Sequence, residues 1–396
     1  MIKIMHVINT LGPGGAENML CGIAAGMDST RFKNEVVSLT GILDLAERLQ
    51  AMGVRVRTLA MKRSVPNPLL VMRLAQWIRK SKPDVIHTWM YHANLVGALA
   101  ARLAGNVPVV WGIHCGLGSS VGNRRTILVN RACALLSGKW PARIICCSQA
   151  SMRTHKDLGY AAEKLEVIPN GFDLKQFKPD PTARGSLRDD LGVPVRTLLI
   201  GMAARFHPEK DHWNFIQAAA QLHKLIPESH FLLCGLDITW QNQQLRGWID
   251  AAGIADCCHL LGVRRDMPRL FSGMDMATIS SRTEAFPVVI GEAMACGTPC
   301  IVTDVGDSAL IVGETGTVVA PGNPDALAAA WRKLIEAGPG VRHRLGMAAR
   351  NRVQQHFALP AVVERYQSTY TQLAGGTLDS VSSMGLSQCA REIPPV

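Results

Sequence analysis

Long apolar runs are missing from this chain of 396 residues, since no stretch approaches the roughly 18 consecutive apolar residues of a membrane-spanning helix. The first residues, 1–12, also lack the long apolar core and small-residue cleavage site of a signal peptide. These absences predict a cytoplasmic protein, with peripheral attachment at the inner membrane face left open. Charged residues make up 18% of the chain and hydrophobic residues 47%, which excludes a mainly disordered protein.

Motifs that hold metals or disulfides are absent as well. The chain has 11 Cys, an odd number, and no C-x-x-C pair, which disfavours both a zinc site and a disulfide framework. Reduced and mostly buried thiols are the expected state. The chain also contains no D-x-D triplet.

Acidic residues are scarce in the first half only. Residues 1–180 contain 23 Lys and Arg against 11 Asp and Glu, a balance of +12, whereas residues 181–396 contain 19 and 20. The whole net charge of +11 therefore lies in the first half, which predicts an anionic partner or a membrane surface on that side. Because no basic motif interleaved with aromatic residues is present, a nucleic acid is not the expected partner.

Short apolar runs alternate with helical patterns along most of the chain, which predicts parallel sheets built from β-α-β units. In the first half, strands are expected at 2–9, 34–39, 54–59, 85–88, 107–113 and 143–147, and helices at 16–27, 43–52, 68–80, 93–104, 121–139 and 148–158. In the second half, strands are expected at 197–204, 230–235, 258–261, 276–280, 299–303 and 316–319, and helices at 212–225, 243–252, 267–273, 288–296 and 324–337.

Two α/β domains follow from this alternation. Residues 169–196 are rich in Pro, Asp and Lys and interrupt it, as a linker would. Residues 341–373 are helical again, with a break at Pro360, and the aperiodic residues 375–396 are expected to form a mobile tail. Two doubly wound domains joined by a linker imply a ligand cleft between them.

A Gly-rich loop, 12–17, follows the first expected strand. Glycines there allow a close backbone approach, and the next helix offers unpaired N–H groups to a phosphate. The spacing matches neither G-x-G-x-x-G nor a P-loop, which disfavours a dinucleotide dehydrogenase and a P-loop NTPase. A tight turn between strand and helix is the structural alternative.

Cations and carboxylates follow two expected strands of the second half. Arg205 and Lys210 come at the carboxyl end of a strand, where open α/β sheets bind ligands, and could clamp a diphosphate. Glu284 and Glu292 flank the start of a helix at Pro287 and would stand at different depths along one wall of a pocket. A solvated charged loop and two ordinary capping or surface glutamates are the alternatives.

One histidine, His114, also stands at the end of an expected strand, within Trp111-Gly-Ile-His-Cys-Gly116. A single histidine can be structural or catalytic. Its position at the presumed cleft keeps the catalytic interpretation open.

In this order, the motifs resemble those of the retaining GT-B glycosyltransferases of family 4, and the likeness covers roughly residues 2–373. The matching pieces are Gly14-Gly15-Ala16-Glu17, Val167-Ile-Pro-Asn-Gly171 with Asp173 and Phe177, Arg205 with Lys210, Glu284 with Glu292, Glu292-Ala-Met-Ala-Cys-Gly297 and Gly316–Gly322. The chain departs from the family at Ala285, where Gly is usual, and at Leu236, where a second Gly is frequent. Both departures concern the donor site more than the fold.

The resemblance implies an α/β fold of the GT-B type, with two Rossmann-like doubly wound domains facing a cleft. Residues 1–180 would form the acceptor-binding domain and residues 181–358 the nucleotide-sugar-binding domain. Residues 359–374 would form a helix that crosses back onto the first domain, and the segment near Asn170 would be the hinge for closure.

The resemblance also implies how the phosphates are bound. Arg205 and Lys210 would hold the diphosphate and stabilise the negative charge of the leaving group. Backbone N–H groups near Gly14 and Gly15 would approach the same phosphates from the first domain. His114 would lie near the sugar and the acceptor.

The same resemblance places the sugar and the ribose. Glu284, with backbone groups of Phe286, Pro287 and Val288, would bind hydroxyls of the donor sugar, and Glu292 would bind the ribose. The implied catalytic residues are His114, Arg205, Lys210 and Glu284. Retention of configuration is expected from attack on the same face, without a covalent enzyme intermediate.

A nucleotide-sugar is the expected co-substrate, with a UDP-sugar ahead of GDP-mannose, although no single residue distinguishes them. No other cofactor and no metal are expected. The chain has no D-x-D motif to bind a metal ion, and Arg205 and Lys210 supply two positive charges that can neutralise the diphosphate instead. The expected acceptor is a glycan or a lipid-linked sugar of bacterial cell-surface polysaccharide synthesis.

A basic and apolar segment of the first half could contact a membrane. Arg124, Arg125, Arg131, Lys139 and Arg143 cluster with apolar residues between 127 and 140, which predicts peripheral contact with anionic headgroups. A solvated helix with one buried face is the alternative.

Two other classes of protein remain compatible with these motifs. The same architecture also supports a nucleotide-sugar epimerase or a phosphorylase, although the chain is short for a phosphorylase and lacks its cofactor-lysine motif. A non-catalytic module that binds a nucleotide-sugar is the other alternative.

Overall fold

The computed structural model describes residues 1–12, 14–41, 44–61, 67–116 and 124–375. The chain divides into two compact units, unit 1 (Met1–Gly171 with Leu359–Val396) and unit 2 (Phe172–Ala358). Unit 1 is left after Gly171, inside the segment 169–196 that the sequence suggests as a linker. The expected mobile tail, 375–396, lies outside the described residues except for its first residue.

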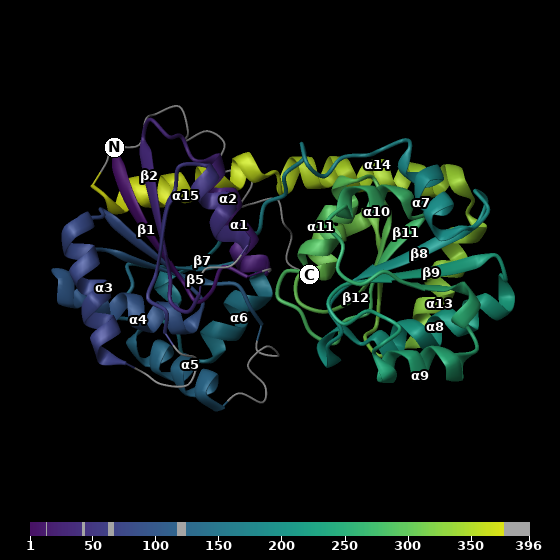
Figure 1. Ribbon diagram of the computed structural model, residues 1–396, viewed down its shortest axis with the longest axis horizontal. Helices are drawn as coiled ribbons and strands as arrows, with labels where there is room; N and C mark the ends of the chain where they lie inside the picture. Colours follow the sequence, from purple (N-terminus) through teal and green to yellow (C-terminus); the bar gives the residue numbers. More distant parts are fainter. Residues whose placement is uncertain (13, 42–43, 62–66, 117–123, 376–396) are drawn as a thin grey trace. The chain divides into compact units, whose positions relative to one another are not determined.

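Seven parallel strands form the sheet of unit 1 (Figure 1): β1 (Ile2–Ile8), β2 (Phe32–Ser38), β3 (Arg55–Thr58), β4 (Val85–Trp89), β5 (Val109–Ile113), β6 (Arg143–Cys146) and β7 (Leu165–Val167). Their order is β3-β2-β1-β4-β5-β6-β7, so the direction of winding reverses between β1 and β4. β4 and β5 are buried along their whole length, as expected for central strands with helices on both faces.

The helices of unit 1 are α1 (Gly15–Gly26), α2 (Asp44–Ala51), α3 (Pro68–Ser81), α4 (Tyr91–Ala104), α5 (Arg124–Leu136), α6 (Gln149–Asp157) and α15 (Leu359–Leu373). α1, α2 and α15 share one apolar core with the sheet, and α3, α4 and α5 share a second. α4 packs closely on β4 because Gly97 has no side chain: a Cβ there would lie 2.4 Å from Cγ2 of Thr88.

A cluster of histidines and aromatic rings joins α15 to the centre of this sheet. His87 Nδ1 and the Tyr370 hydroxyl lie 2.6 Å apart. Trp89 Nε1 donates to His6 Nδ1 at 3.3 Å, and the other ring nitrogen of His6 lies 3.1 Å from the Asn34 side-chain oxygen. Burial lowers the pKa of His6 to about 4 and the pKa of His87 well below its usual value, so both rings are neutral. We call this group the histidine-aromatic cluster.

Six parallel strands form the sheet of unit 2: β8 (Leu198–Ala203), β9 (Ser229–Cys234), β10 (Cys258–Leu260), β11 (Met276–Ile279), β12 (Cys300–Thr303) and β13 (Thr317–Val319). Their order is β10-β9-β8-β11-β12-β13, so the winding reverses between β8 and β11. Open sheets of this kind bind ligands at the carboxyl ends of the strands that flank such a reversal.

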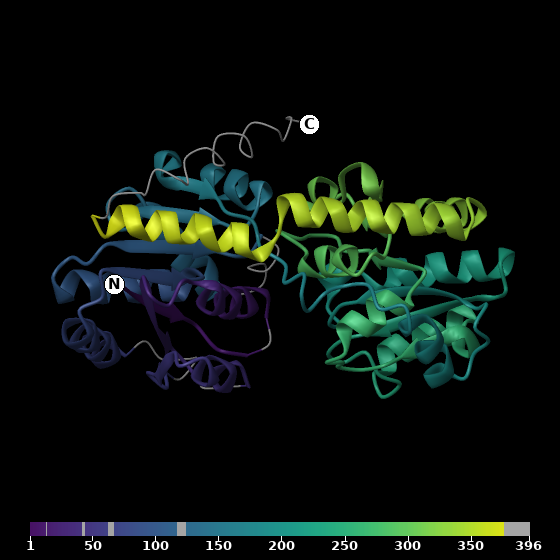
Figure 2. The ribbon, with the colours of Figure 1, turned by 90° about the horizontal axis from the view of Figure 1, so that it is seen from above.

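The helices of unit 2 are α7 (Ala183–Leu191), α8 (His212–Leu225), α9 (Gln243–Ala252), α10 (Met267–Gly273), α11 (Val288–Ala295), α12 (Ser308–Val312), α13 (Pro324–Glu336) and α14 (Pro339–His356). α8, α9 and α13 share an apolar core with the sheet. Among the other helices, α7 packs on α10, α10 on α11, and α11 on α14. Figure 2 shows α14 lying along unit 2 and α15 lying along unit 1.

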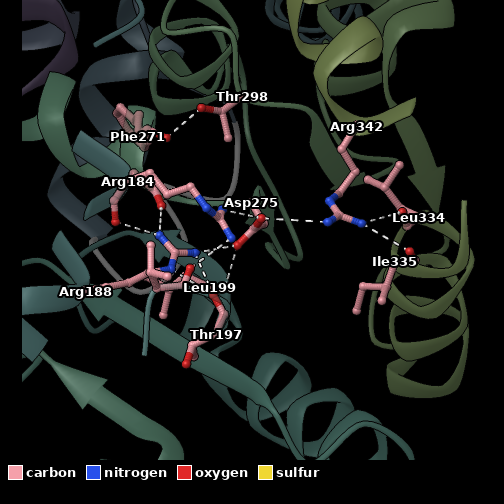
Figure 3. A network of polar contacts seen from close by, with 12 residues as sticks. Arg184, Arg188, Thr197, Leu199, Phe271, Asp275, Thr298, Leu334, Ile335 and Arg342 are labelled. Atoms are coloured by element: carbon pink, nitrogen blue, oxygen red, sulfur yellow. Dashed lines mark hydrogen bonds and ion pairs between the residues drawn. The ribbon is translucent and has the colours of Figure 1, made fainter. Parts of the chain in front are cut away.

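An ionic network centred on Asp275 binds the amino ends of β8 and β11 (Figure 3). Arg184 and Arg188 donate to the two carboxylate oxygens of Asp275 at 2.6 and 2.7 Å, and Arg342 lies 3.9 Å away. Leu199 N donates to the same carboxylate at 2.9 Å. Arg188 and Arg342 also donate to carbonyls at the carboxyl ends of α10 and α13, where a helix favours a cation. We call this group the Asp275 network.

The two-sheet α/β architecture expected from the sequence is confirmed, and α8, α9 and α10 have the expected bounds. Three short elements, β7, α7 and α12, are not predicted; α7 lies in the segment expected to be a linker. The helix break falls at Phe357–Ala358, and Pro360 lies in the first turn of α15 instead. Within the described ranges, no helix is both long and apolar enough to cross a bilayer.

Candidate donor and acceptor sites

Arg205 follows β8, at the carboxyl edge of the sheet in unit 2. Its side chain is exposed and makes no hydrogen bond or ion pair with any residue that the structure describes. The backbone beside it passes very close to β9, because a Cβ at Gly235 would lie 2.2 Å from the carbonyl oxygen of Ala204. Gly235 (φ 145°) thus lets the two backbone segments approach closely beside Arg205.

Lys210 ends a 3₁₀ turn, Pro208–Lys210, immediately before α8. Asp211 takes a left-handed φ of 48° and its side chain accepts a hydrogen bond from Asn214 N at 3.3 Å, which caps α8. The cap holds Lys210 at the start of the helix. Asp211 is a supporting residue that the sequence analysis does not name, although an Asp before an apolar helical pattern is a recognisable cap signal.

Glu284, in the loop after β11, forms an ion pair with Lys210, 74 residues away in sequence. The same carboxylate oxygen accepts a hydrogen bond from Ser281 Oγ at 2.8 Å. Only 22% of the Lys210 side chain and 12% of the Glu284 side chain are exposed, so water screens the pair weakly. The cation and the carboxylate predicted for one donor site therefore lie in direct contact.

The loops after β8 and β11 are also tied together by hydrogen bonds of Ser280 and Arg282. Arg282 N donates to the carbonyl oxygen of Glu209 at 2.8 Å, and Arg282 Nε donates to Asp211 Oδ2 at 2.7 Å. Ser280 Oγ lies 3.0 Å from the carbonyl oxygen of Lys210. This bonding fixes the relative position of Lys210 and Glu284 at the point where the sheet reverses.

Gly306 supports the backbone at Glu284 from the loop after β12. It has a φ of 59°, and a Cβ there would lie 2.5 Å from the carbonyl oxygen of Glu284. The neighbouring Asp307 N donates to the carbonyl oxygen of Ala285 at 3.0 Å. Nothing in the local sequence predicts this role, because it arises from a contact between two distant loops.

The amino end of α11 lies directly after this loop. Pro287 is the residue before the helix, and no side chain caps it. The first N–H groups of α11, beginning at Val288, have no partner inside the helix and suit an oxygen ligand. Phe286 is 6% exposed and its side chain packs inward. The predicted contact with the donor sugar therefore concerns only backbone groups of Phe286.

Glu292 lies in the second turn of α11, as expected. Burial raises the pKa of its carboxyl group to about 8, so the group is protonated at neutral pH. A protonated carboxyl both donates and accepts hydrogen bonds, which suits a partner such as a ribose hydroxyl.

In unit 1, the amino end of α1 is covered by its own glutamate. Gly14 precedes the helix and Gly15 begins it. A Cβ at Gly14 would lie 2.2 Å from Oε2 of Glu17, so the space left by this glycine holds the Glu17 carboxyl group, whose pKa burial raises. A phosphate approaching this helix end at Gly14 meets that carboxyl group first.

His114 follows β5, and its ring stacks on Trp89 with 4.8 Å between ring centroids. Burial lowers the pKa of His114 to about 4, against a smaller opposing effect of Asn170. Both ring nitrogens are buried, beside the side chain of Asn170. His114 is therefore a neutral imidazole that could exchange hydrogen bonds with a ligand but carries no positive charge at pH 7.

The predicted residues thus fall into two groups. Arg205, Lys210 and Glu284 gather at the carboxyl edge of the unit 2 sheet, with Glu292 in the adjoining helix. Gly14, Gly15 and His114 lie at the carboxyl ends of strands in unit 1. The functional roles of these residues remain predictions.

Thiols and possible metal ligands are dispersed. The ten cysteines between Cys21 and Cys300 are all free and buried. Across the described ranges, no three His, Cys, Asp or Glu side chains gather closely enough to hold a metal ion.

Each half of the chain matches a family model. Residues 184–352 match the model described as Glycosyl transferases group 1. Residues 13–176 match the model described as Glycosyltransferase Family 4. The two matches together span most of the described chain.

Two curated relatives and one solved structure are similar over much of the chain. The UDP-Gal:alpha-D-GlcNAc-diphosphoundecaprenol alpha-1,3-galactosyltransferase of Escherichia coli is 26% identical over 341 residues, 85% of this chain and 86% of that protein. The N,N'-diacetylbacillosaminyl-diphospho-undecaprenol alpha-1,3-N-acetylgalactosaminyltransferase of Campylobacter jejuni is 25% identical over 285 residues, 69% and 73% of the two chains. The crystal structure of Anabaena Alr3699/HepE in complex with UDP-glucose is 26% identical, with a TM-score of 0.82 over 94% of this chain and 100% of that chain.

Proposed function

This chain belongs to the family 4 glycosyltransferases, and we propose that it transfers a hexose, with retention of configuration, from a UDP-sugar to a hydroxyl group of a lipid-linked glycan. The relatives from E. coli and C. jejuni are named for acceptors linked to undecaprenol through a diphosphate, and HepE is bound to UDP-glucose. These names support a UDP-sugar donor and a lipid-linked acceptor. The reaction would belong to the synthesis of a bacterial cell-surface polysaccharide.

The contact between Lys210 and Glu284, beside the unpaired Arg205, carries this proposal. In the donor complex, Arg205 and Lys210 bind the diphosphate and stabilise the negative charge that grows on the leaving UDP. Glu284 then exchanges part of its contact with Lys210 for hydroxyls of the donor sugar. Because the guanidinium of Arg205 and the ammonium of Lys210 supply the positive charge, we propose that transfer needs no metal ion.

The remaining groups bind the ends of the donor. Glu292, as a protonated carboxyl, hydrogen-bonds the ribose, and the open N–H groups at the start of α11 bind sugar oxygens. Gly14 and Gly15 approach the phosphates after Glu17 has moved aside. His114 contacts the sugar or the acceptor as a neutral imidazole. The acceptor hydroxyl attacks the anomeric carbon from the face that UDP leaves, so the new C–O bond forms as the bond to the diphosphate breaks, and the hydroxyl proton passes to a phosphate oxygen of the departing UDP.

Donor binding and transfer test this function directly. We expect UDP to bind more tightly than GDP by calorimetry, and a UDP-hexose to be consumed only when an undecaprenyl-diphosphate sugar is added. Isomerisation of the donor sugar without an acceptor would instead indicate an epimerase.

Variants at the ion pair identify the site. Lys210→Ala should lower the transfer rate by about 10²–10³-fold, because a charge contact to the leaving group is lost. Glu284→Gln should weaken binding of the sugar moiety of the donor. The affinity for UDP-hexose should therefore fall more than the affinity for UDP. Lys224→Ala, on an exposed lysine of α8, is the matched control and should leave both unchanged. Equal effects of Lys210→Ala and Lys224→Ala would contradict the assigned site.

We also propose that unit 1 rests on an anionic membrane surface that carries the acceptor. None of the helices α3, α4 and α5 contains Asp or Glu, and together they contain seven Lys and Arg. On α5, Arg124, Leu128, Arg131 and Leu135 recur every three or four residues and are all exposed. Leu128 is 63% and Leu135 86% exposed. Exposed leucines beside arginines suit a headgroup layer.

Vesicle flotation tests this attachment. The protein should float with vesicles containing anionic phospholipid at low salt and remain unbound with neutral vesicles or at high salt. Leu128→Ser should weaken flotation, whereas Leu225→Ser, in unit 2 and also 63% exposed in the native chain, should not. Flotation that is independent of vesicle charge, or equal for the two variants, would rule out this surface.

A further inference from the structure

Two phenylalanines mark the points where the chain enters and leaves unit 2. Phe172 is the first residue of the unit, and Phe357 is the last but one. Phe172 N donates to the carbonyl oxygen of Phe357 at 2.8 Å, and Phe172 forms an isolated parallel bridge with Ala358. The entering and leaving segments are therefore bonded to each other within unit 2.

Both rings contact Phe286, in the loop between Glu284 and α11. The ring of Phe172 is stacked on Phe286 at 6.1 Å between centroids, and Phe357 meets Phe286 edge-on at 5.8 Å. Phe172 and Phe357 lie 6.4 Å apart, and all three rings are less than a tenth exposed. We call this group the entry-exit trio. Aromatic groups of this geometry have defined relative orientations.

Gly291, one turn into α11, makes room for the trio. A Cβ at Gly291 would lie 2.0 Å from Cζ of Phe172, so any side chain there would collide with the ring. The ring of Phe172 thus touches both the loop that carries Glu284 and the helix that carries Glu292.

From these contacts we infer that Phe172 and Phe357 are positioning residues for the donor-binding loop, 284–292. This inference rests on the proposed function, which assigns that loop to the sugar and the ribose. A shift of Phe286 would carry Ala285 and Pro287 with it, and these two residues join it to Glu284 and to the amino end of α11. The rings at the entry and exit of the chain therefore set where the loop stands, and a displacement below 1 Å is enough to cost binding and rate.

Unit 2 contains a second aromatic trio that serves as a matched control. Phe215, Phe231 and Trp331 form contacts of 5.1 to 6.2 Å between ring centroids. This core trio is fully buried, but none of its members lies in or beside residues 284–292. A substitution there disturbs packing in the same unit without touching the donor-binding loop.

The experiment compares Phe172→Leu and Phe357→Leu with Phe231→Leu in the full chain. Hydrogen exchange of peptides covering residues 284–292 should increase about tenfold in the first two variants and stay within about twofold in the third. Binding of UDP should weaken about tenfold in the first two variants only. Using two entry-exit variants keeps the test informative if one of them fails to fold.

A paired substitution tests the contact itself. Gly291→Ala should weaken UDP binding about tenfold, because its methyl group meets the Phe172 ring. Leu has no atom at the position of Cζ, so Phe172→Leu combined with Gly291→Ala should recover binding to within about threefold of the native protein. Additive losses in the double variant would overturn the inference, and so would equal exchange in Phe172→Leu and Phe231→Leu.

The outcomes separate this inference from the proposed function. If the native protein binds neither UDP nor GDP but exchange at 284–292 still responds to the entry-exit variants, the proposed function fails and the positioning role stands. If UDP binds normally and neither exchange nor affinity distinguishes the two trios, the positioning role fails and the proposed function stands.

Discussion

The two units share a strand order but fill the centre of the sheet differently. In unit 1, the polar groups beside β1 and β4 are neutral: His6 and His87 hydrogen-bond Asn34, Trp89 and Tyr370 within the histidine-aromatic cluster. In unit 2, the amino ends of β8 and β11 are held by the charged Asp275 network. One topology thus accepts two kinds of buried polar chemistry, a neutral cluster and a charged network.

The same difference extends to the candidate sites. His114 of unit 1 is a neutral ring stacked on Trp89. Lys210 and Glu284 of unit 2 are a charged pair. Removing one partner of a charged pair leaves the other charge uncompensated, whereas acid protonates buried neutral histidines. We therefore expect different perturbations to lower the stability of the two units.

Asp275→Asn should produce the largest effect, because it removes the only carboxylate among the described contacts of the Asp275 network. Arg188, which is fully buried, would then keep its charge without compensation. We expect a loss of about 3–5 kcal/mol of unfolding free energy, confined to unit 2. Hydrogen exchange resolved by peptide, together with calorimetry, measures it.

Asp190→Asn is the control for this substitution, since Asp190 pairs with Arg269 at the surface and is 55% exposed. An exposed pair of this kind contributes less than about 1 kcal/mol. A loss in unit 1 equal to that in unit 2 would contradict the assignment of the Asp275 network to one unit.

Acid should act mainly on unit 1. The pKa of His6 and of His114 is about 4 in the folded state, against an ordinary 6.5, so the unfolded chain binds more protons between these values. Stability is therefore full above pH 6.5 and falls as the pH drops toward 4, by about 2 kcal/mol per histidine at pH 5. Exchange of β1, β4 and α15 peptides at pH 7.5, 6 and 5 measures the loss.

Unit 2 contains groups of both signs over this range. His212, His230 and His259 also have a lowered pKa, but Glu292 has a raised pKa and favours the folded state as the pH falls. Among the described residues of unit 1, five histidines have a lowered pKa, and they outnumber Glu17 and Glu166, whose pKa is raised. The net change in unit 2 should be the smaller one. If unit 2 lost more stability in acid than unit 1, the proposed difference between the two units would be contradicted.

Glu292→Gln should remove the pH dependence that this carboxyl group imposes on unit 2. The folded pKa of about 8 lies above the ordinary 4.5, so the stability it contributes is complete below 4.5 and is lost as the pH rises to 8. The neutral amide avoids that loss. We expect the variant to gain about 4 kcal/mol on the native chain between pH 5 and pH 9, measured by denaturant unfolding. An unchanged difference across this range would show that Glu292 is ionised in the folded protein.

Tyr370→Phe should have the smallest effect of the four, about 1 kcal/mol in unit 1. The substitution keeps the ring and removes the hydroxyl that lies 2.6 Å from His87 Nδ1. Thermal unfolding measures the change, and Tyr366→Phe is the control because the hydroxyl of Tyr366 has no hydrogen-bond partner among the described residues. Equal losses in the two variants would assign the effect to packing alone.

Much of the fold is predictable because its signals are local. The apolar period and the residues before the helix, such as Asp211 before α8 and Asn242 before α9, indicate where these helices begin. β7 has three half-buried residues and α12 has five residues, too few to show a period. α7 is missed because its Asp- and Arg-rich sequence resembles a linker, although Leu187 and Arg188 are buried.

The candidate site is predictable in its residues more than in its contacts. Arg205, Lys210, Glu284 and Glu292 are named from motifs, and the structure brings the first three to one edge of the sheet. The bond between Lys210 and Glu284 joins distant loops, and so does the support that Gly306 gives to Glu284. Such pairings depend on how the strands are ordered in space, which no local pattern records.

The interrupted chain of unit 1 has a consequence for its synthesis on the ribosome. β1 and β4 are made early, but α15, which carries the Tyr370 partner of His87, is made only after all of unit 2. At about 5–20 residues per second, the roughly 190 residues of unit 2 take about 10–40 s to translate. During that interval the nascent unit 1 lacks the part of its core that α15 supplies, beside α1 and α2, whereas unit 2 emerges with every residue of its core. The second unit in the sequence is therefore the first that can complete its folding.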